Sequence, residues 1–413
     1  MSGRSWGPRV HSLRPGTRGA WLARCQTNAR ADPLPNLFNC VLALREDPHW
    51  QNALGFDEML QVAVLRSSGA PVCDPDVYGI HLWMQEAGIE KMPLEVVREA
   101  VEIVSREHRF HPLRDWLNGL VWDGVPRLTN WLATYLGVAA DDYHCEIGPR
   151  FLIGMVARVM QPGCQSDYML VLIGEQGEEK SKVCRTLASD AYFSSHLPDL
   201  AADPVRLSMH LRGKWLIEVA ELAAFGSNLI KAEHLKAFIT RQVEQYTPKH
   251  ARKEVAEPRQ CLLIGTHNEP QFLRDATGNR RYWPVICGVI DLAALARDRE
   301  QLFAEAIEAY HNGARWWPER GFERRVIEPV QATHLHVDAW VEPIEDYLAT
   351  ATAQAIAAAA FPRVTIAQVA RHSGLGIPDG KLDQLQQKRI QAVLRSLKWR
   401  PGRTMHGRFW TPP

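Results

Sequence analysis

The spacing of apolar residues divides the chain into a helical part and a part that alternates strands with helices. From residue 34 to about 158 the pattern is mostly helical. In the segment 93–108, apolar side chains recur three and four positions apart and charged side chains fill the positions between them, as in a helix that packs one face on a core. A second helical block runs from 129 to 160. We therefore predict an N-terminal helical domain over 34–150.

The period changes after residue 160. Residues 168–173 (YMLVLI) form a short continuous apolar run that ends at Gly174, which is typical of a strand buried on both faces. Similar runs recur at 215–219, 261–264 and 282–286, separated by helical or loop-rich stretches. Strands that alternate with helices indicate a three-layer α/β domain, placed at 151–320.

The last part of the chain has a different order of elements. A charged stretch at 321–339 suggests a linker, and three helices are expected at 343–360, at 366–372 with Thr365 as the N-cap, and at 388–397. A basic, glycine-punctuated segment follows at 399–410. Three helices followed by a basic hairpin predict a winged-helix-like domain over 340–413.

Composition narrows the class of protein. The 413 residues are 46% hydrophobic and 23% charged, which fits a folded chain of two or three domains and excludes a disordered or collagen-like one. No apolar run approaches the roughly 18 residues of a membrane helix, so no membrane partner is expected. The eight cysteines are scattered without a CxxC pair, which favours reduced thiols in a cytoplasmic protein.

Charge is balanced overall but not locally. Lysine and arginine total 48 against 47 acidic residues, yet residues 1–31 carry six arginines and no acid, and the C-terminal end is also basic. We interpret residues 1–33 as a basic, disordered arm. The segment has no apolar core of the kind found in secretory signals. An arginine-rich leader without acids does superficially resemble an organelle transit peptide.

A candidate phosphate-binding loop follows the first apolar strand. The segment GEQGEEKS places glycines at Gly174 and Gly177 and ends in Lys180 and Ser181, just before a helical pattern. In such a loop, backbone amides at the helix N-terminus hold phosphate oxygens, the lysine reaches the β- and γ-phosphates, and the serine helps to place Mg²⁺. The candidate nucleotide-binding residues are Gly174, Gln176, Gly177, Glu179, Lys180 and Ser181. An ordinary strand-to-helix turn is the alternative.

The loop departs from the phosphate-loop pattern at one position. Glu179 stands where the pattern has glycine. A Cβ is expected to suit the backbone there less well than glycine does, and a carboxylate about 4 Å from a phosphate costs on the order of 4 kcal/mol at an effective dielectric of about 20. This penalty shrinks if the side chain points to solvent.

Three further groups could serve a nucleotide site. Glu218 and Glu221 lie at the end of the second apolar strand, where carboxylates can orient water and hold Mg²⁺, and Asn268 follows the third strand. Arg280 and Arg281 precede the fourth strand and could reach a neighbouring subunit's γ-phosphate. The alternatives are a solvated strand edge for the acids, an Asx-turn for the asparagine, and solvated side chains for the arginines.

Six ordered segments together resemble the virulence-associated protein E family. They are HPLRDWLNGLVWDGVPRL, GEQGEEKS, GKWLIEVAEL, EHLKAFITRQVEQY, LLIGTHN and FLRDATGNRRYWPV, within residues 34–317. The family consists of helicase-primase proteins of phages and mobile islands and is similar to superfamily 3 helicases of the AAA+ class. The resemblance implies an AAA+ phosphate-loop core and an ATP-dependent DNA helicase or translocase that acts as a ring, expected to be a hexamer, in DNA replication.

The resemblance also implies roles for individual residues. Gly174, Gly177, Lys180 and Ser181 match the phosphate loop, Asn268 matches the sensor, and Arg280 and Arg281 match the arginine finger. Glu221, with Glu218 nearby, matches the acidic motif, so Ser181 and Glu221 are the expected Mg²⁺ ligands beside ATP.

The expected DNA contacts fall in two places. The segment 246–259 matches a hairpin that projects into a central DNA channel in superfamily 3 relatives, and the basic C-terminal domain supplies further phosphate contacts. The candidates for single-stranded or forked DNA are Lys236, Lys249, His250, Arg252, Lys253, Arg389, Arg395, Lys398 and Arg400.

Two departures leave a second function open. Glu179 replaces the last loop glycine, and Thr247 stands where relatives tend to have arginine. The alternative is a DNA-binding replication initiator or assembly factor that hydrolyses ATP poorly. The sequence holds no primase motif, so priming is expected to belong to a separate protein.

Overall fold

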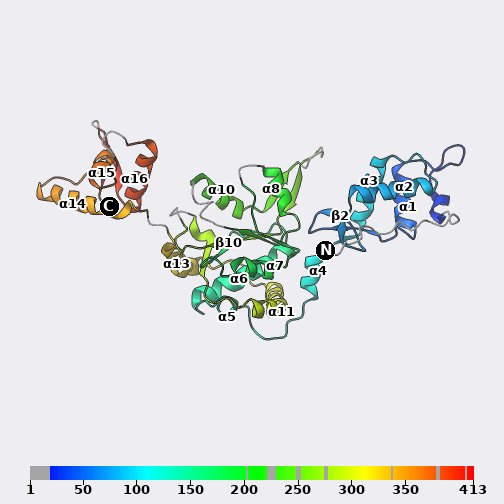
Figure 1. The fold of residues 1–413 in the computed structure, drawn as a ribbon, viewed down its shortest axis with the longest axis horizontal. Coiled ribbons are helices and arrows are strands. Elements are labelled where there is room, and N and C mark those ends of the chain that lie inside the picture. The colour runs from blue at the N-terminus through cyan, green and yellow to red at the C-terminus, as the bar shows by residue number, and fades with distance from the viewer. Residues whose placement is uncertain are drawn as a thin grey trace. The chain divides into compact units, whose positions relative to one another are not determined.

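The structure, a computed structural model, consists of two compact units (Figure 1). Unit 1 comprises Met1–Pro270 and Thr277–Ala332, and unit 2 comprises Gln271–Ala276 and Thr333–Pro413. The structure describes residues 19–200, 203–220, 229–247, 253–273, 278–335, 338–377, 382–404 and 407–413. The expected arm at 1–33 lies mostly outside these ranges. The expected boundary at residue 150 falls inside a helix, and helices also occupy much of the segment interpreted as a linker.

The N-terminal part of unit 1 combines helices with a small sheet. The predicted amphipathic helix is present as α3 (Leu94–Glu107), and its apolar face packs in a core with the other helices of this part. The sheet, in the order β3-β2-β1-β4, was not predicted. The elements are η1 (Ala20–Arg24), α1 (Leu37–Glu46), β1 (Leu54–Asp57), β2 (Val62–Leu65), β3 (Ala70–Pro71), α2 (Asp74–Glu86), α3 and β4 (Arg109–Phe110).

A parallel sheet of five strands forms the centre of unit 1. Its strands are β5 (Met169–Ile173), β6 (Phe193–Ser194), β7 (Leu216–Val219), β10 (Leu262–His267) and β11 (Tyr282–Ile286), in the order β11-β5-β10-β7-β6. Four of them confirm the predicted apolar runs, so the α/β class is confirmed. Because all the strands are parallel, the loops that follow β5, β7 and β10 meet at one edge of the sheet.

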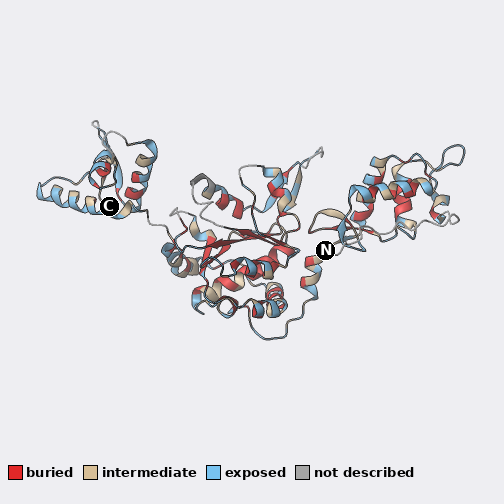
Figure 2. Cartoon of the chain, viewed as in Figure 1, coloured by how far each residue is buried: buried red, intermediate tan, exposed pale blue. Residues whose placement is uncertain are grey.

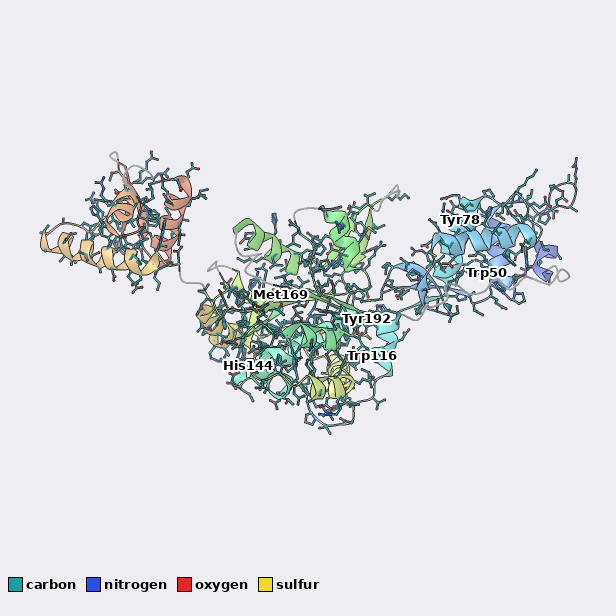
Figure 3. The ribbon with its side chains drawn as sticks, viewed as in Figure 1. Trp50, Tyr78, Trp116, His144, Met169 and Tyr192 are labelled. Carbon is teal, nitrogen blue, oxygen red and sulfur yellow. The ribbon has the colours of Figure 1, made fainter. Side chains whose placement is uncertain are left out.

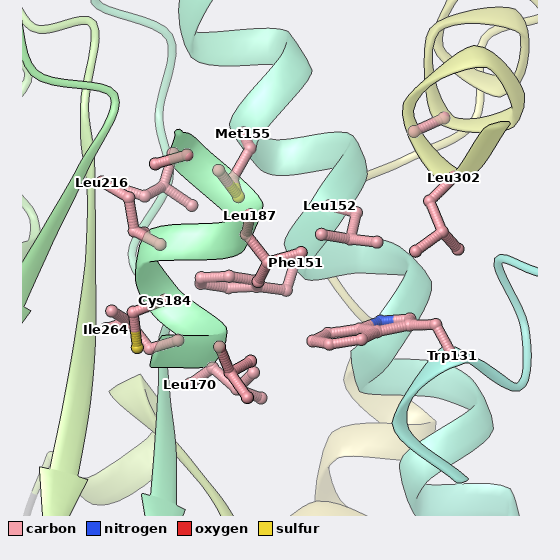
Figure 4. Packing of buried hydrophobic residues seen from close by; sticks show 14 of the residues in the cluster. Trp131, Phe151, Leu152, Met155, Leu170, Cys184, Leu187, Leu216, Ile264 and Leu302 are labelled. Carbon is pink, nitrogen blue, oxygen red and sulfur yellow. The ribbon is translucent and has the colours of Figure 1, made fainter. Parts of the chain in front are cut away.

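Helices cover both faces of this sheet (Figure 1). Figure 2 shows that buried residues are concentrated in the sheet and along the helix sides that face it. On one face, α6 (Asp142–Met160), α7 (Lys180–Ala188) and α11 (Leu292–His311) share a core in which Cys184 lies beside the sheet residue Ile264 and Leu302 points toward α6 (Figure 4). Helix α7 is therefore fixed against the sheet just after the candidate loop.

The remaining elements of unit 1 connect these layers. Trp116 of α4, labelled in Figure 3, lies edge-on to Trp215 and Phe303 and joins α4 to the main core. The elements are α4 (Pro112–Gly119), α5 (Trp131–Leu136), α8 (Pro204–Leu211), α10 (Leu229–Ile239), β8 (Val243–Tyr246), β9 (Val255–Pro258), η2 (Asn279–Arg281), α12 (Arg320–Phe322), the π-helical turn η3 (Glu323–Ile327) and α13 (Glu328–Thr333).

Unit 2 is a small helical domain with a hairpin. Its elements are α14 (Val341–Ala357), α15 (Ile366–His372), α16 (Gln384–Ser396), β12 (Arg400–Thr404) and β13 (Gly407–Thr411). The three helices and the antiparallel hairpin confirm the predicted element order, and Thr365 caps α15 by accepting a hydrogen bond from Gln368. Val364 pairs with Trp410, which adds a third short strand segment to the hairpin.

Within the ranges that the structure describes, no helix is both long enough and apolar enough to cross a membrane.

Candidate nucleotide site

The loop after β5 has the backbone shape that its glycines predict. The Gly174 N–H donates to the His267 carbonyl at 3.2 Å, which ties the beginning of the loop to the end of β10. A Cβ on Gly174 would overlap the Glu178 carboxylate, and Gly177 has φ +96°. Gly177 therefore needs glycine for its dihedral angle, whereas a side chain at Gly174 would meet only the end of the flexible Glu178 side chain, which can move.

The first amides of α7 are available to bind an anion. The N–H groups of Glu179, Lys180 and Ser181, all within the described chain, have no hydrogen-bond acceptor, and no side chain caps the helix. Unpaired N–H groups at the start of a helix carry partial positive charge and point outward along its axis. These three groups therefore form a local donor set that suits phosphate oxygens.

Lys180 adds a buried cation beside these amides. Its side-chain ammonium donates to the carbonyls of Gly174 at 2.7 Å and Glu175 at 2.6 Å, and the residue is only 7% exposed. No carboxylate forms an ion pair with Lys180 among the described residues. A buried ammonium whose only partners are carbonyls is stabilised further by an anion, so the lysine and the amides favour the same ligand.

Glu179 bears the strain that the sequence suggests, but its charge points away from the loop. Its backbone is left-handed, with φ +59° and ψ +13°, which costs a residue with a Cβ about 1–2 kcal/mol. Its carboxylate pairs with Lys182 at 2.6 Å, and its side chain is 40% exposed. The backbone penalty is therefore present, whereas water and Lys182 screen the charge penalty.

A buried carboxylate stands beside the loop serine. Glu218 on β7 is 1% exposed, and its Oε1 accepts hydrogen bonds from Ser181 Oγ at 2.5 Å and Thr266 Oγ1 at 2.7 Å. Glu218 forms no ion pair within the described part of the chain. A buried carboxylate without a cation is costly, so this position suits a bound cation.

These residues fit Mg²⁺ better than a metal held by protein alone. In the described ranges no three His, Cys, Asp or Glu side chains cluster as metal ligands. Magnesium is commonly held by one or two protein groups together with phosphate oxygens and water. Glu218 and Ser181 provide such a partial set. Glu221, the other expected ligand, lies outside the described residues.

Asn268 lies just past β10, one residue after the carbonyl that accepts the Gly174 N–H. It is exposed at the same edge of the sheet as the candidate loop. This placement is compatible with the predicted role in positioning water, and that role stays a prediction.

The two arginines lie at the opposite end of the sheet. Tyr282, the first residue of β11, pairs with Met169, the first residue of β5, while the loop follows Ile173 at the far end. Five residues of β11, at about 3.3 Å each, separate Arg281 from the loop edge by roughly 15 Å. This is farther than an arginine side chain extends, so neither arginine reaches the loop of its own subunit.

The arginines also differ from each other. Arg280 is exposed and has no hydrogen-bond or ion-pair partner among the described residues. Arg281 is half-buried, donates to the Gly278 carbonyl at 3.2 Å and lies near the side chain of Lys236. Arg280 is therefore the one displayed for contact with another molecule.

The candidate DNA contacts around the β8–β9 hairpin are placed unevenly. Lys236 is 5% exposed and pairs with Glu233, so its side chain is not displayed for a ligand in this conformation. Lys253 is exposed and lies two residues before the second hairpin strand, β9. Lys249, His250 and Arg252 lie outside the described residues.

The base of this hairpin is held by a buried polar network. Glu244 on β8 accepts hydrogen bonds from Arg259, Arg241 and Ser208. Burial raises the pKa of Glu244, but its arginine partners outweigh burial and lower the pKa overall. The adjoining cavity of about 340 Å³ and a second one of about 660 Å³ beside α6 contain no residue of the candidate loop.

In unit 2, one of the predicted DNA contacts is already engaged. Arg389 donates to Asp338 at 2.7 Å and lies 4.0 Å over the Trp340 ring, which gives it a role within the domain. Arg395, Lys398 and Arg400 are exposed. All four DNA roles stay predictions.

The sheet and the loop at its edge define an α/β protein with a candidate phosphate-binding turn. The model of the Virulence-associated protein E-like domain matches residues 117–336, more than half of the chain, and the protein belongs to this family. No curated protein matches the chain.

The solved structures that the chain resembles include forms of one protein region. The apo structure of the NrS-1 C terminal region (305-718) is 12% identical, with a TM-score of 0.45 over 86% of this chain and 94% of that one. The A form apo structure of the same region is 13% identical, with a TM-score of 0.48 over 86% and 95%.

Proposed function

We propose that the protein is an ATP-dependent DNA helicase or translocase of a phage or mobile genetic element, with ATP and Mg²⁺ as its cofactors. The observation that carries the proposal is the group at one edge of the sheet: three unpaired amides, the buried ammonium of Lys180, and a buried carboxylate on the loop serine. The amides and the ammonium are complementary to the negative triphosphate, and the carboxylate is complementary to its cation. Mg²⁺ would supply charge neutralisation to the phosphates there.

The order of the strands supports an AAA+ core. β10 lies between β5 and β7, so the strand that Asn268 follows borders both the loop strand and the acidic strand. One strand can thus contact both the phosphate loop and Glu218, through the His267 carbonyl and Thr266.

A ring is proposed because the finger candidate cannot act within its own subunit. Arg280 lies across the sheet from the loop, so stabilisation of the phosphates by this residue needs a second copy of the chain. A closed ring, a hexamer in this proposal, would place each Arg280 at a neighbour's loop and surround a DNA strand.

Unit 2 is proposed to bind DNA as a winged-helix domain. Its helices, the bridge of Val364 to Trp410 and the hairpin follow that element order. Arg403 and Arg408 stand directly opposite each other on the hairpin, and both are exposed. Like charges in this position repel, and a DNA phosphate between them would relieve the repulsion.

The test of this function is ATP hydrolysis by the full chain with and without single-stranded DNA. We expect Mg²⁺-dependent hydrolysis that DNA stimulates, with less stimulation at higher salt because the DNA contacts are ionic. A chelator in place of Mg²⁺ is the control. A preparation that binds ATP yet shows no stimulation would contradict the motor.

The left-handed Glu179 favours a second candidate function, a DNA-binding initiator or assembly factor with poor ATP turnover. Two variants separate the two penalties of this residue. Glu179→Gln removes the charge and keeps the Cβ, whereas Glu179→Gly also removes the backbone strain. We expect Glu179→Gln to change nucleotide affinity less than about tenfold, because Lys182 and solvent already screen the carboxylate.

Glu179→Gly is expected to raise the free energy of unfolding by about 1 kcal/mol, measured by denaturant titration, because glycine tolerates positive φ. Nucleotide titration of both variants completes the comparison. A gain approaching a thousandfold in Glu179→Gln would show that the charge suppresses binding, which would favour the second candidate.

A further inference from the structure

The end of β10 carries a hydroxyl that the sequence pattern does not single out. Thr266 Oγ1 donates to Glu218 Oε1 at 2.7 Å, and Thr266 is 7% exposed. In the register of β10 with β7, Ile264 pairs with Glu218. Side chains alternate along a strand, so Thr266 stands on the same face as Glu218, one diagonal step toward the loop edge.

The hydroxyl arrangement around Glu218 is asymmetric. Ser181 Oγ and Thr266 Oγ1 both donate to the same carboxylate oxygen, Oε1. Ser181 belongs to the loop-bearing helix, whereas Thr266 belongs to the rigid centre of the sheet. A serine that becomes a magnesium ligand directs its oxygen lone pair to the cation. Thr266 is the donor whose place does not depend on the loop.

We propose that Thr266 is a positioning residue that fixes the rotamer of Glu218 for a Mg²⁺–nucleotide complex. The inference rests on the proposed function of the same site. A buried carboxylate held by a hydrogen bond from a strand keeps one orientation, and a fixed ligand loses less entropy when the cation arrives. Because Asn268 directly follows the end of β10, two residues after Thr266, the same strand links the sheet edge to the proposed metal-binding carboxylate.

The experiment compares Thr266→Val, which removes the hydroxyl at nearly constant volume, with Thr266→Ser, which retains it. A fluorescent ATP analogue is titrated into the full chain with excess Mg²⁺ and again with EDTA. Thr266→Val is expected to weaken the Mg²⁺-dependent affinity about tenfold or more, since a hydrogen bond to a charged group is removed, and to leave the EDTA affinity unchanged. Thr266→Ser is expected to stay within about threefold of wild type.

Thermal unfolding without nucleotide supplies the second readout. If Thr266→Val lowers stability but leaves the Mg²⁺-dependent affinity as in wild type, the residue is only structural and the proposal is overturned. An equal loss in Thr266→Ser, which keeps the hydroxyl, would mean that the site responds to any change in side-chain shape and not to the hydroxyl, which would overturn the proposal as well. If Thr266→Val does not fold, Thr266→Ala takes its place. A folded wild type that binds no analogue in either buffer would overturn the proposed function and this inference together.

Discussion

Replacing Lys180 by methionine is expected to weaken nucleotide binding by roughly a hundredfold or more and to abolish ATP hydrolysis. Methionine fills a similar volume, so the core around α7 should persist, but it removes the ammonium that now bonds the carbonyls of Gly174 and Glu175. Charge-assisted hydrogen bonds are worth about 1.5–3 kcal/mol each, so the loss of two phosphate contacts corresponds to roughly a hundredfold or more in affinity. Titration with a labelled ATP analogue and Mg²⁺ measures it.

Lys182→Met is the matched control. Lys182 lies on the same helix and carries the same charge, but it is exposed and pairs with Glu179. We expect nucleotide affinity within a few-fold of wild type, the small loss arising from the released Glu179 carboxylate. Equal losses in the two variants would mean that the loop responds to overall charge, and the phosphate-loop interpretation would be wrong.

The sequence predicts the parts of the fold in which one pattern persists over enough residues. The continuous apolar runs correspond to β5, β7, β10 and β11, and the helical spacing corresponds to α3. The N-terminal sheet was not predicted, because its strands are two to four residues long and too short to show an alternation of apolar and polar residues. Strand β6 was not predicted for the same reason, since it has two residues.

The candidate site is predictable in its motif but not in its partners. The spacing of Gly174, Lys180 and Ser181 indicates a loop before a helix, and the structure has one there. Which carboxylate meets Ser181 depends on the strand order, and only the structure places Glu218 on it. The role of Thr266 was not predicted, because threonine is common in strands for its β-propensity and nothing in the sequence shows what its hydroxyl contacts.

The orientation of Glu179 is likewise a structural result. The sequence predicts both a strained backbone and a repelling charge, and it cannot separate them. The structure retains the positive φ and directs the carboxylate to Lys182. Similarly, two adjacent arginines are equivalent in the sequence, whereas the structure exposes Arg280 and folds Arg281 back to Gly278.

That difference leads to the second large expected effect. Arg280→Ala should reduce ATP hydrolysis about a thousandfold, as expected for the loss of an arginine finger, and leave nucleotide affinity unchanged, because the residue lies at the far end of β11 from its own loop. Arg324→Ala is the matched control, because Arg324 and Arg280 both lie near Glu323. Burial raises the pKa of Glu323, and the charges of both arginines oppose that rise.

Mixing two inactive variants distinguishes action between subunits from action within one. A subunit with Arg280→Ala keeps its loop, and a subunit with Lys180→Met keeps its arginine. In a randomly mixed ring at equal amounts, about a quarter of the interfaces combine an intact loop with an intact Arg280, so hydrolysis should return to roughly that fraction if each interface works independently. If the mixture exchanges subunits but stays inactive, then either the interfaces do not hydrolyse ATP independently or the assignment of Arg280 is wrong. Wild type doped with the Arg280→Ala variant separates these outcomes: independent interfaces lose activity in proportion to the variant, whereas coupled ones lose it more steeply.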